Sequence, residues 1–212
     1  AWIAAQPEGR TAIVASWYPR SFAPYFPGTT LPQFRRAWRD AHYVVIYVNQ
    51  WQRDEPSAAE VAYFAAQRPL HVVRAHGIDY ARIYAGPQVR PAEWETLRAR
   101  VVGDGLTFGE SVRLLGHTVE RVGAGDGDGR APDQALKIMA GERAAVTLYW
   151  QALAPFPATD YAITLRLRAA DGRTVAEVTE APVIGLLPVE RWQPGQIIRD
   201  VHVLIIPADV QA

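Results

Sequence analysis

The segment Tyr43–Val48 (YVVIYV) constrains the fold more than any other part of the chain. It consists of β-branched and aromatic residues and carries no charge, which predicts a β-strand. Its apolar character is continuous rather than alternating, and this is typical of a parallel strand whose two faces are both covered. We therefore expect the segment to lie inside a parallel sheet.

The segments on either side of this strand predict a small α/β unit. Thr11–Ala15 (TAIVA) and His71–Ala75 (HVVRA) are short apolar runs that predict two further strands. Ser57 and Glu60 have the spacing of a capping box, which predicts that a helix begins there. Strand, helix and strand with short connections form a βαβ unit. Tyr80–Tyr84 predicts an antiparallel strand at the edge of this sheet.

The apolar residues change to a period of two after Leu106. The alternation is clearest in Tyr161–Arg168 (YAITLRLR), and Asp171-Gly172 then predicts a hairpin turn into Thr174–Thr179. Three further segments predict strands: Ser111–Val122, Ala145–Ala152 and Val201–Ile206. Several short strands separated by turns indicate an antiparallel β-sandwich, either immunoglobulin-like or jelly-roll-like.

The predicted fold class is therefore α+β with two domains. Residues 1–88 form a small α/β module with a mostly parallel sheet, residues 89–104 form a connector, and residues 105–212 form the β-sandwich. The apolar residues Trp2 and Ile3 near the start of the chain have no helix-start signal before them, which favours a segment cut from a longer helix and a longer protein. A processed but otherwise intact protein is the alternative.

Composition excludes several classes of function. The formal net charge is zero, which argues against a nucleic-acid-binding protein because phosphate neutralisation needs a basic face. The chain has no cysteine, so disulfides, thiolate nucleophiles and cysteine-ligated zinc are excluded. It contains no run of about 18 apolar residues that would span a bilayer.

The carboxyl ends of the predicted parallel strands mark a candidate ligand site, because ligands of open parallel sheets gather there. The segment Ala15–Gly28 (ASWYPRSFAPYFPG) brings aromatic rings and an arginine to this edge. Arginines beside flat rings suit a phosphate or a sugar. Alternatively, these rings pack against the second domain or against missing parts of a longer protein. The candidate residues at this edge are Trp17, Tyr18, Arg20, Asn49, Trp51, Arg53, His76 and Asp79.

The remaining motifs in the sequence indicate no catalytic residue, no metal site and no cofactor. The chain has no G-x-S-x-G elbow, no H-E-x-x-H and no Walker A motif. Gly123–Gly129 (GAGDGDG) lacks the later glutamate of an EF-hand loop, so a solvated turn is the preferred interpretation. Trp150 shares a strand face with apolar residues and is expected in the core. Trp192, in a proline-bounded loop, is a candidate exposed ring for a sugar, or else a lid over the end of the sandwich.

Five segments resemble a known family: SWYPRSFAPYF (Ser16–Phe26), YVVIYVNQWQR (Tyr43–Arg53), HVVRAHGIDYARIY (His71–Tyr84), AGERAAVTLYWQAL (Ala140–Leu153) and RWQPGQIIRD (Arg191–Asp200). They resemble the C-terminal soluble region of bacterial multi-spanning glycosyltransferases, similar to the protein mannosyltransferase and aminoarabinose transferase group. The resemblance implies a polyprenyl-phosphate sugar donor and transfer on the outer side of the membrane. It also implies a key acidic residue in an early loop between membrane helices, which is not in this sequence.

The resemblance thus implies a non-catalytic extracytoplasmic region that scaffolds or gates the reaction of a membrane-bound glycosyltransferase. Its implied partners are the membrane-spanning part of the same parent chain and a lipid-linked sugar or glycan. An independent carbohydrate-binding module is the alternative, with Trp192 or the Trp17–Arg20 edge as its sugar site. A small hydrolase assembled from separated Ser, His and Asp residues is a third hypothesis.

Overall fold

The computed structural model describes residues 2–32, 37–55, 57–103, 105–122, 136–156 and 161–209. Its helices and mixed sheets confirm the predicted α+β class. The chain divides into two compact units, Ala1–Leu97 (unit 1) and Arg98–Ala212 (unit 2). The first part of the predicted connector, as far as Leu97, belongs to unit 1. The candidate calcium loop Gly123–Gly129 lies outside the described residues.

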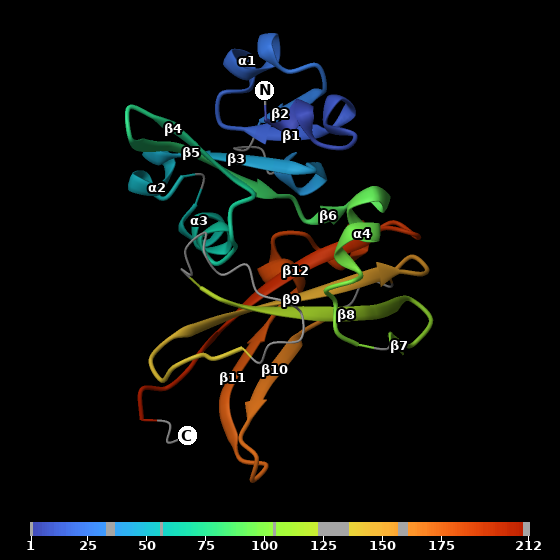
Figure 1. Cartoon of the computed structure of the whole chain (residues 1–212). Helices are drawn as coiled ribbons and strands as arrows, with labels where there is room; N and C mark the ends of the chain where they lie inside the picture. The colour runs from blue at the N-terminus through green and yellow to red at the C-terminus, as the bar shows by residue number, and fades with distance from the viewer. Residues whose placement is uncertain are drawn as a thin grey trace. The chain divides into compact units, whose positions relative to one another are not determined.

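Unit 1 is built on a mixed sheet with the strand order β2-β1-β3-β5-β4 (Figure 1). Its strands are β1 (Ile13–Ser16), β2 (Thr29–Pro32), β3 (Tyr43–Tyr47), β4 (His71–Ala75) and β5 (Ile78–Ala85). β1 pairs in parallel with both β2 and β3. β5 pairs antiparallel with both β3 and β4. All strands except β5 therefore run in the same direction, and the carboxyl ends of β1, β3 and β4 lie at one end of the sheet, which we call the carboxyl edge.

Two details of this sheet differ from the prediction. β5 was expected at the edge but lies between β3 and β4, so that β4 is the edge strand. As a consequence β3 has one parallel neighbour, β1, and one antiparallel neighbour, β5, and does not lie inside an all-parallel sheet as its sequence predicts. The tight turn at His76 and Gly77, both of which have positive φ (51° and 80°), pairs β5 with β4, whereas the place of β5 inside the sheet follows from its pairing with β3, which is distant in the sequence. The second difference is β2, which was not predicted. It ends in Pro32, and an edge strand tolerates proline because one side of it needs no ladder hydrogen bonds.

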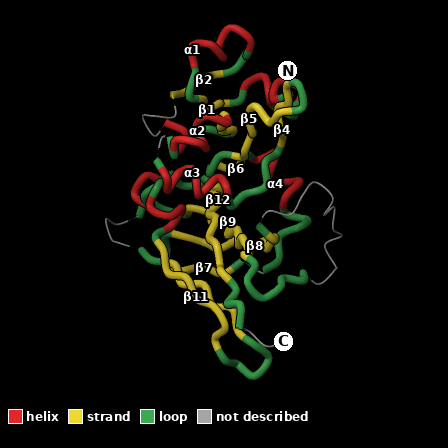
Figure 2. Tube along the Cα trace, turned by 90° about the vertical axis from the view of Figure 1, so that its left-hand side faces the viewer, coloured by secondary structure: helices red, strands yellow, loops and turns green. Residues whose placement is uncertain are grey.

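The helices of unit 1 are short (red in Figure 2). They are α1 (Pro19–Phe22), α2 (Val48–Arg53), α3 (Ala58–Ala65) and α4 (Pro91–Leu97), with 3-10 turns η1 (Ile3–Ala5), η2 (Gly9–Thr11), η3 (Ala23–Tyr25) and η5 (Ala37–Asp40). The predicted start of α3 is confirmed, because Ser57 Oγ accepts from the Glu60 backbone N–H at 3.3 Å. Helix α2 was not predicted. It follows β3 directly, and Gln50 caps it by accepting from the Tyr47 backbone N–H at 2.9 Å.

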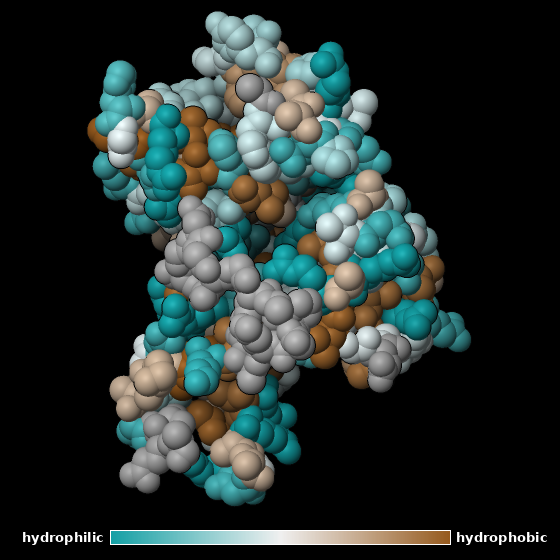
Figure 3. Space-filling model, in the orientation of Figure 1, coloured by the Kyte–Doolittle hydropathy of each residue, from teal (hydrophilic) through white to brown (hydrophobic). Residues whose placement is uncertain are grey.

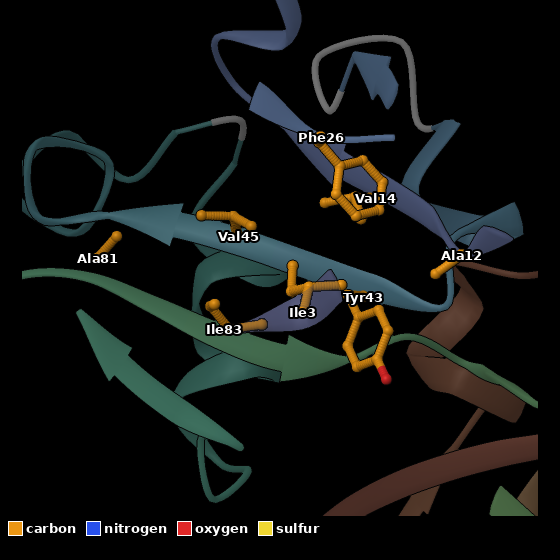
Figure 4. Close-up of a cluster of buried hydrophobic side chains, with 8 residues drawn as sticks. All are labelled: Ile3, Ala12, Val14, Phe26, Tyr43, Val45, Ala81 and Ile83. Atoms are coloured by element: carbon orange, nitrogen blue, oxygen red, sulfur yellow. The ribbon is translucent and has the colours of Figure 1, made fainter. Parts of the chain in front are cut away.

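Both faces of β3 are covered, as its continuous apolar sequence predicts. On one face, a buried cluster is formed by Ile3, Ala12, Val14, Phe26, Tyr43, Val45, Ala81 and Ile83 (Figure 4). On the other face, the rings of Trp38 and Phe64 meet edge-to-face with their centroids 5.2 Å apart. The centroid of the Phe64 ring lies 5.5 Å from that of Tyr84. Phe22 packs against the first cluster beside Phe26. Part of the aromatic loop thus covers its own sheet.

Unit 2 contains an antiparallel sheet in which β12 (Ile197–Ile205), β9 (Arg143–Ala152), β8 (Val112–Arg121) and β7 (Leu106–Phe108) are neighbours in that order. The two strands β10 (Ile163–Arg168) and β11 (Thr174–Glu180) form a separate hairpin, as predicted (yellow in Figure 2). Two 3-10 turns, η6 (Pro182–Gly185) and η7 (Val189–Arg191), lead from β11 to β12. The short strand β6 (Gln88–Val89) precedes α4 in unit 1.

Candidate functional site

The carboxyl edge of unit 1 is formed by the segments that follow β1, β3 and β4. Trp17, Tyr18 and α1 follow β1, helix α2 follows β3, and the His76-Gly77 turn follows β4. The chain direction therefore brings the predicted residues of unit 1 to one end of the sheet, as expected. Some of their side chains belong to two clusters, one around Tyr47 and one around Trp51, and the others lie outside both.

The first cluster joins the loop after β1 to the start of α2. Asn49 Nδ2 donates a hydrogen bond to Tyr18 Oη at 2.9 Å. The Tyr18 ring meets the Tyr47 ring edge-to-face with centroids 5.3 Å apart. Tyr47 Oη in turn lies 3.3 Å from Ser16 Oγ, a buried hydroxyl at the end of β1. Burial raises the pKa of Tyr47, so its hydroxyl stays protonated at neutral pH and keeps a hydrogen to donate.

A β-bulge adds Tyr80 to this cluster. Val73 pairs with Ala81 and Arg74 pairs with Asp79, so that Tyr80 is the extra residue on β5. Such a bulge re-aims a side chain. The Tyr80 ring lies 6.0 Å from the Tyr47 ring in an edge-to-face arrangement. Tyr18, Tyr47 and Tyr80 therefore form a row of three rings, and we call this row with Ser16 and Asn49 the tyrosine cluster.

The second cluster surrounds Trp51. The guanidinium carbon of Arg82 lies 5.5 Å from the centre of the Trp51 ring, a cation–π contact. Trp51 also lies 6.2 Å from Tyr84, which belongs to the opposite face of the sheet from Val45. Asp79 pairs with Arg74 at 2.9 Å and with Arg82 at 3.4 Å. Trp51 and Asp79 are thus occupied by contacts within the chain.

Two predicted arginines remain exposed. Arg20 lies in α1 and Arg53 ends α2, and neither forms an ion pair with any other residue that the structure describes. His76 is exposed in the turn between β4 and β5, and Trp17 is half-buried beside Tyr18. The arginines of the edge without a described ion pair therefore come from α1 and α2, whereas Arg74 of β4 and Arg82 of β5 share the single carboxylate of Asp79.

Apolar side chains are exposed beside these charges. Ile78 is 65% exposed and Tyr80 is 54% exposed, and Tyr18, Val48 and Val73 are exposed as well. Figure 3 shows the apolar surface of the β4–β5 hairpin in brown, next to polar surface in teal. An exposed patch of rings and aliphatic side chains rimmed by charge is typical of a binding surface.

Trp192 does not belong to a binding surface, and the expectation of an exposed ring is wrong. Its side chain is only 3% exposed, its Nε1 donates to the Leu187 carbonyl at 3.3 Å, and Phe156 meets it edge-to-face. The proline-bounded loop is therefore folded onto unit 2. Trp150 is buried, as expected, and its Nε1 donates to Asp200 Oδ2 at 3.0 Å.

Tyr47, Tyr80 and Arg82 contribute to the edge but were not among the predicted residues. Tyr47 is the last residue of β3, so its position at a strand end could have identified it. Tyr80 depends on the bulge and Arg82 on the placement of β5 inside the sheet. Neither of these features has a signal in the sequence.

Among the residues that the structure describes, no serine hydroxyl hydrogen-bonds a histidine ring, and no group of His, Asp and Glu is arranged to hold a metal ion. No helix in the described segments has the length and hydropathy to span a membrane. No family model, curated protein or solved structure matches the chain.

Proposed function

We propose that this chain is the non-catalytic, extracytoplasmic C-terminal region of a membrane-bound glycosyltransferase that uses a polyprenyl-phosphate sugar. In this proposal it scaffolds the reaction or gates access of the substrate, and its partner is the membrane-spanning part of the same protein. The observation that carries the proposal is the carboxyl edge of unit 1. Exposed tyrosines and aliphatic side chains lie there beside Arg20 and Arg53, which have no described carboxylate partner.

The chemistry of this edge suits a phosphate with an isoprenyl chain and a sugar. Guanidinium groups pair with phosphate oxygens, and the rings and aliphatic side chains bury apolar groups. In this proposal Tyr18 and Asn49, whose side chains hydrogen-bond each other, supply polar atoms for the hydroxyl groups of a sugar. We also infer that the two units act as separate domains. In unit 2, the β10–β11 hairpin and the larger sheet would form the two layers of the predicted sandwich, since Glu180 of β11 contacts His202 of β12.

Binding of geranyl phosphate, a short isoprenyl phosphate, tests this function. We expect the probe to change the tryptophan fluorescence of the chain, because Trp17 and Trp51 lie at the edge. The double change Arg20→Gln and Arg53→Gln should weaken binding at least about a hundredfold, since each of the two lost charge-assisted hydrogen bonds contributes about 1.5–3 kcal/mol. Arg10→Gln is the matched control, because exposed Arg10 precedes β1 and lies at the other end of that strand. Equal loss in the control variant would contradict the proposal.

The isolated chain should not turn over a lipid-linked sugar. Product formation by this chain alone, measured with a radiolabelled sugar, would show a catalytic centre within it and overturn the non-catalytic role.

The alternative is an independent carbohydrate-binding module. The row of rings Tyr18, Tyr47 and Tyr80, with Asn49 hydrogen-bonded to its first member, favours it. Neutral saccharides at millimolar concentration separate the two functions. A carbohydrate-binding module would bind these saccharides although they carry no phosphate, and the changes Tyr18→Ala and Tyr80→Ala would abolish the binding. If the saccharides leave the tryptophan fluorescence of the chain unchanged, the module is excluded.

A further inference from the structure

A histidine of unit 2 is buried between two carboxylates. His202 and Asp200 are two residues apart on β12, and Glu180 ends β11. Nδ1 of His202 lies 2.8 Å from Glu180 Oε2, and Nε2 lies 2.9 Å from Asp200 Oδ1. The side chains of His202 and Asp200 are fully buried, whereas that of Glu180 is 36% exposed. We call these three residues the histidine cluster.

The geometry of the histidine cluster favours a charged ring. An ionised carboxylate only accepts hydrogen bonds, and a neutral imidazole has only one N–H to donate. Both contacts are attractive only when both ring nitrogens carry a proton. The Nδ1 contact is a hydrogen bond, whereas the Nε2–H of His202 is not aligned with Asp200, so that contact is an attraction between charges.

The charges around the ring favour the protonated form. Burial lowers the pKa of His202, but the contacts with Asp200 and Glu180 outweigh it and hold the pKa above its ordinary value. β9 presents the uncharged Val146 opposite His202, and η6 presents the backbone of Val183 to Asp200. Within the described ranges, the charged groups that face His202 are thus the two carboxylates, one from β12 and one from β11.

Asp200 also holds a strained turn. Its Oδ1 accepts from the Val183 backbone N–H at 2.6 Å, and its Oδ2 accepts from Trp150 Nε1 at 3.0 Å. Val183 and Ile184 have φ of 50° and 46°, in the left-handed region. Such a conformation is an outlier for β-branched residues and persists only where the surroundings enforce it. The same carboxylate therefore neutralises His202 and anchors the turn η6.

We propose that the histidine cluster is a pH-operated latch on the turn Pro182–Gly185. When His202 loses its proton as the pH rises, Asp200 and Glu180 lose the positive charge between them. Asp200 then faces a nitrogen that has no hydrogen, and the turn that it anchors is strained at Val183 and Ile184. The turn opens, and the Val183 amide loses its hydrogen bond.

The sign of the pH dependence follows from the raised pKa. A histidine whose folded-state pKa exceeds its unfolded value contributes stability fully below about pH 6.5, the ordinary pKa. That contribution is lost as the pH rises through the folded-state pKa. The latch is therefore closed in mild acid and opens towards alkaline pH.

NMR of the whole chain tests the latch. At about pH 6, long-range ¹H–¹⁵N spectra should show both ring nitrogens of His202 protonated. With rising pH, hydrogen-exchange protection of the Val183 amide should fall with the same midpoint as the loss of the His202 proton. The His117 amide, which donates to the Val102 carbonyl at 2.9 Å, is the internal reference and should keep its protection.

The variant Glu180→Gln keeps an acceptor but removes one charge at a partly exposed position, so it should fold. It should move both midpoints to lower pH together, whereas His117→Gln should move neither. A neutral His202 ring at about pH 6 would overturn the latch. Val183 protection that stays constant while His202 deprotonates would overturn it equally.

Discussion

Trp38 shows at the level of one residue how unit 1 is held together. Its ring is 1% exposed and contacts Tyr63 and Phe64 of α3. Its Nε1 donates to Glu60 Oε1 at 2.7 Å, and Ser57 Oγ donates to the second oxygen of the same carboxylate, also at 2.7 Å. A single buried carboxylate thereby fixes both the start of α3 and the position of η5.

Trp38→Phe should therefore destabilise the chain. The change removes a buried donor from Glu60 and is expected to cost about 1–3 kcal/mol of the free energy of unfolding, measured by urea denaturation. The double change with Glu60→Gln should cost less than the sum of the two single changes, because the pair interacts directly. Strictly additive losses would show that the hydrogen bond contributes nothing.

At the level of elements, the β4–β5 hairpin determines the shape of the carboxyl edge. Its turn places Asp79 and Tyr80, and the turn depends on Gly77 with φ of 80°. A Cβ at Gly77 would meet no atom within 4 Å, so the cost of a side chain there is conformational and not steric. Gly172, in the β10–β11 hairpin, has φ of 84° and the same open surroundings.

Gly77→Ala and Gly172→Ala form a matched pair. Each should lower the free energy of unfolding by about 1–2 kcal/mol, because alanine disfavours the left-handed region. Only Gly77→Ala should weaken binding of geranyl phosphate, because only that turn carries Tyr80. Equal weakening by both variants would mean that binding follows stability and does not depend on the edge.

The sequence predicts elements well wherever one local pattern determines them. The runs at Tyr43–Val48 and His71–Ala75, the cap at Ser57 and the Asp171-Gly172 hairpin all appear as predicted. The place of β5 between two strands and the bulge at Tyr80 were not predictable, because both depend on pairing between segments distant in the sequence. The burial of Trp192 was missed for the same reason, since Phe156 covers it.

At the level of the whole molecule, the formal net charge of zero conceals a local arrangement of charge. In unit 1, Arg74 and Arg82 share the carboxylate of Asp79 at one side of the carboxyl edge, while Arg20 and Arg53 stay without a described carboxylate. In unit 2, the buried carboxylate of Asp200 and the partly exposed carboxylate of Glu180 flank His202. We propose that the first arrangement serves an anionic ligand and that the second responds to pH, so the two units have different roles.

The most direct test of the central proposal is a residue-by-residue NMR map of the whole chain titrated with geranyl phosphate. We predict chemical-shift changes in the three segments that meet at the carboxyl edge, Ser16–Arg20, Asn49–Arg53 and His76–Tyr80, with saturation at one common ligand concentration. Changes confined to unit 2, or no changes in these three segments at saturating probe, would contradict the proposal that this edge binds the phosphate-linked substrate.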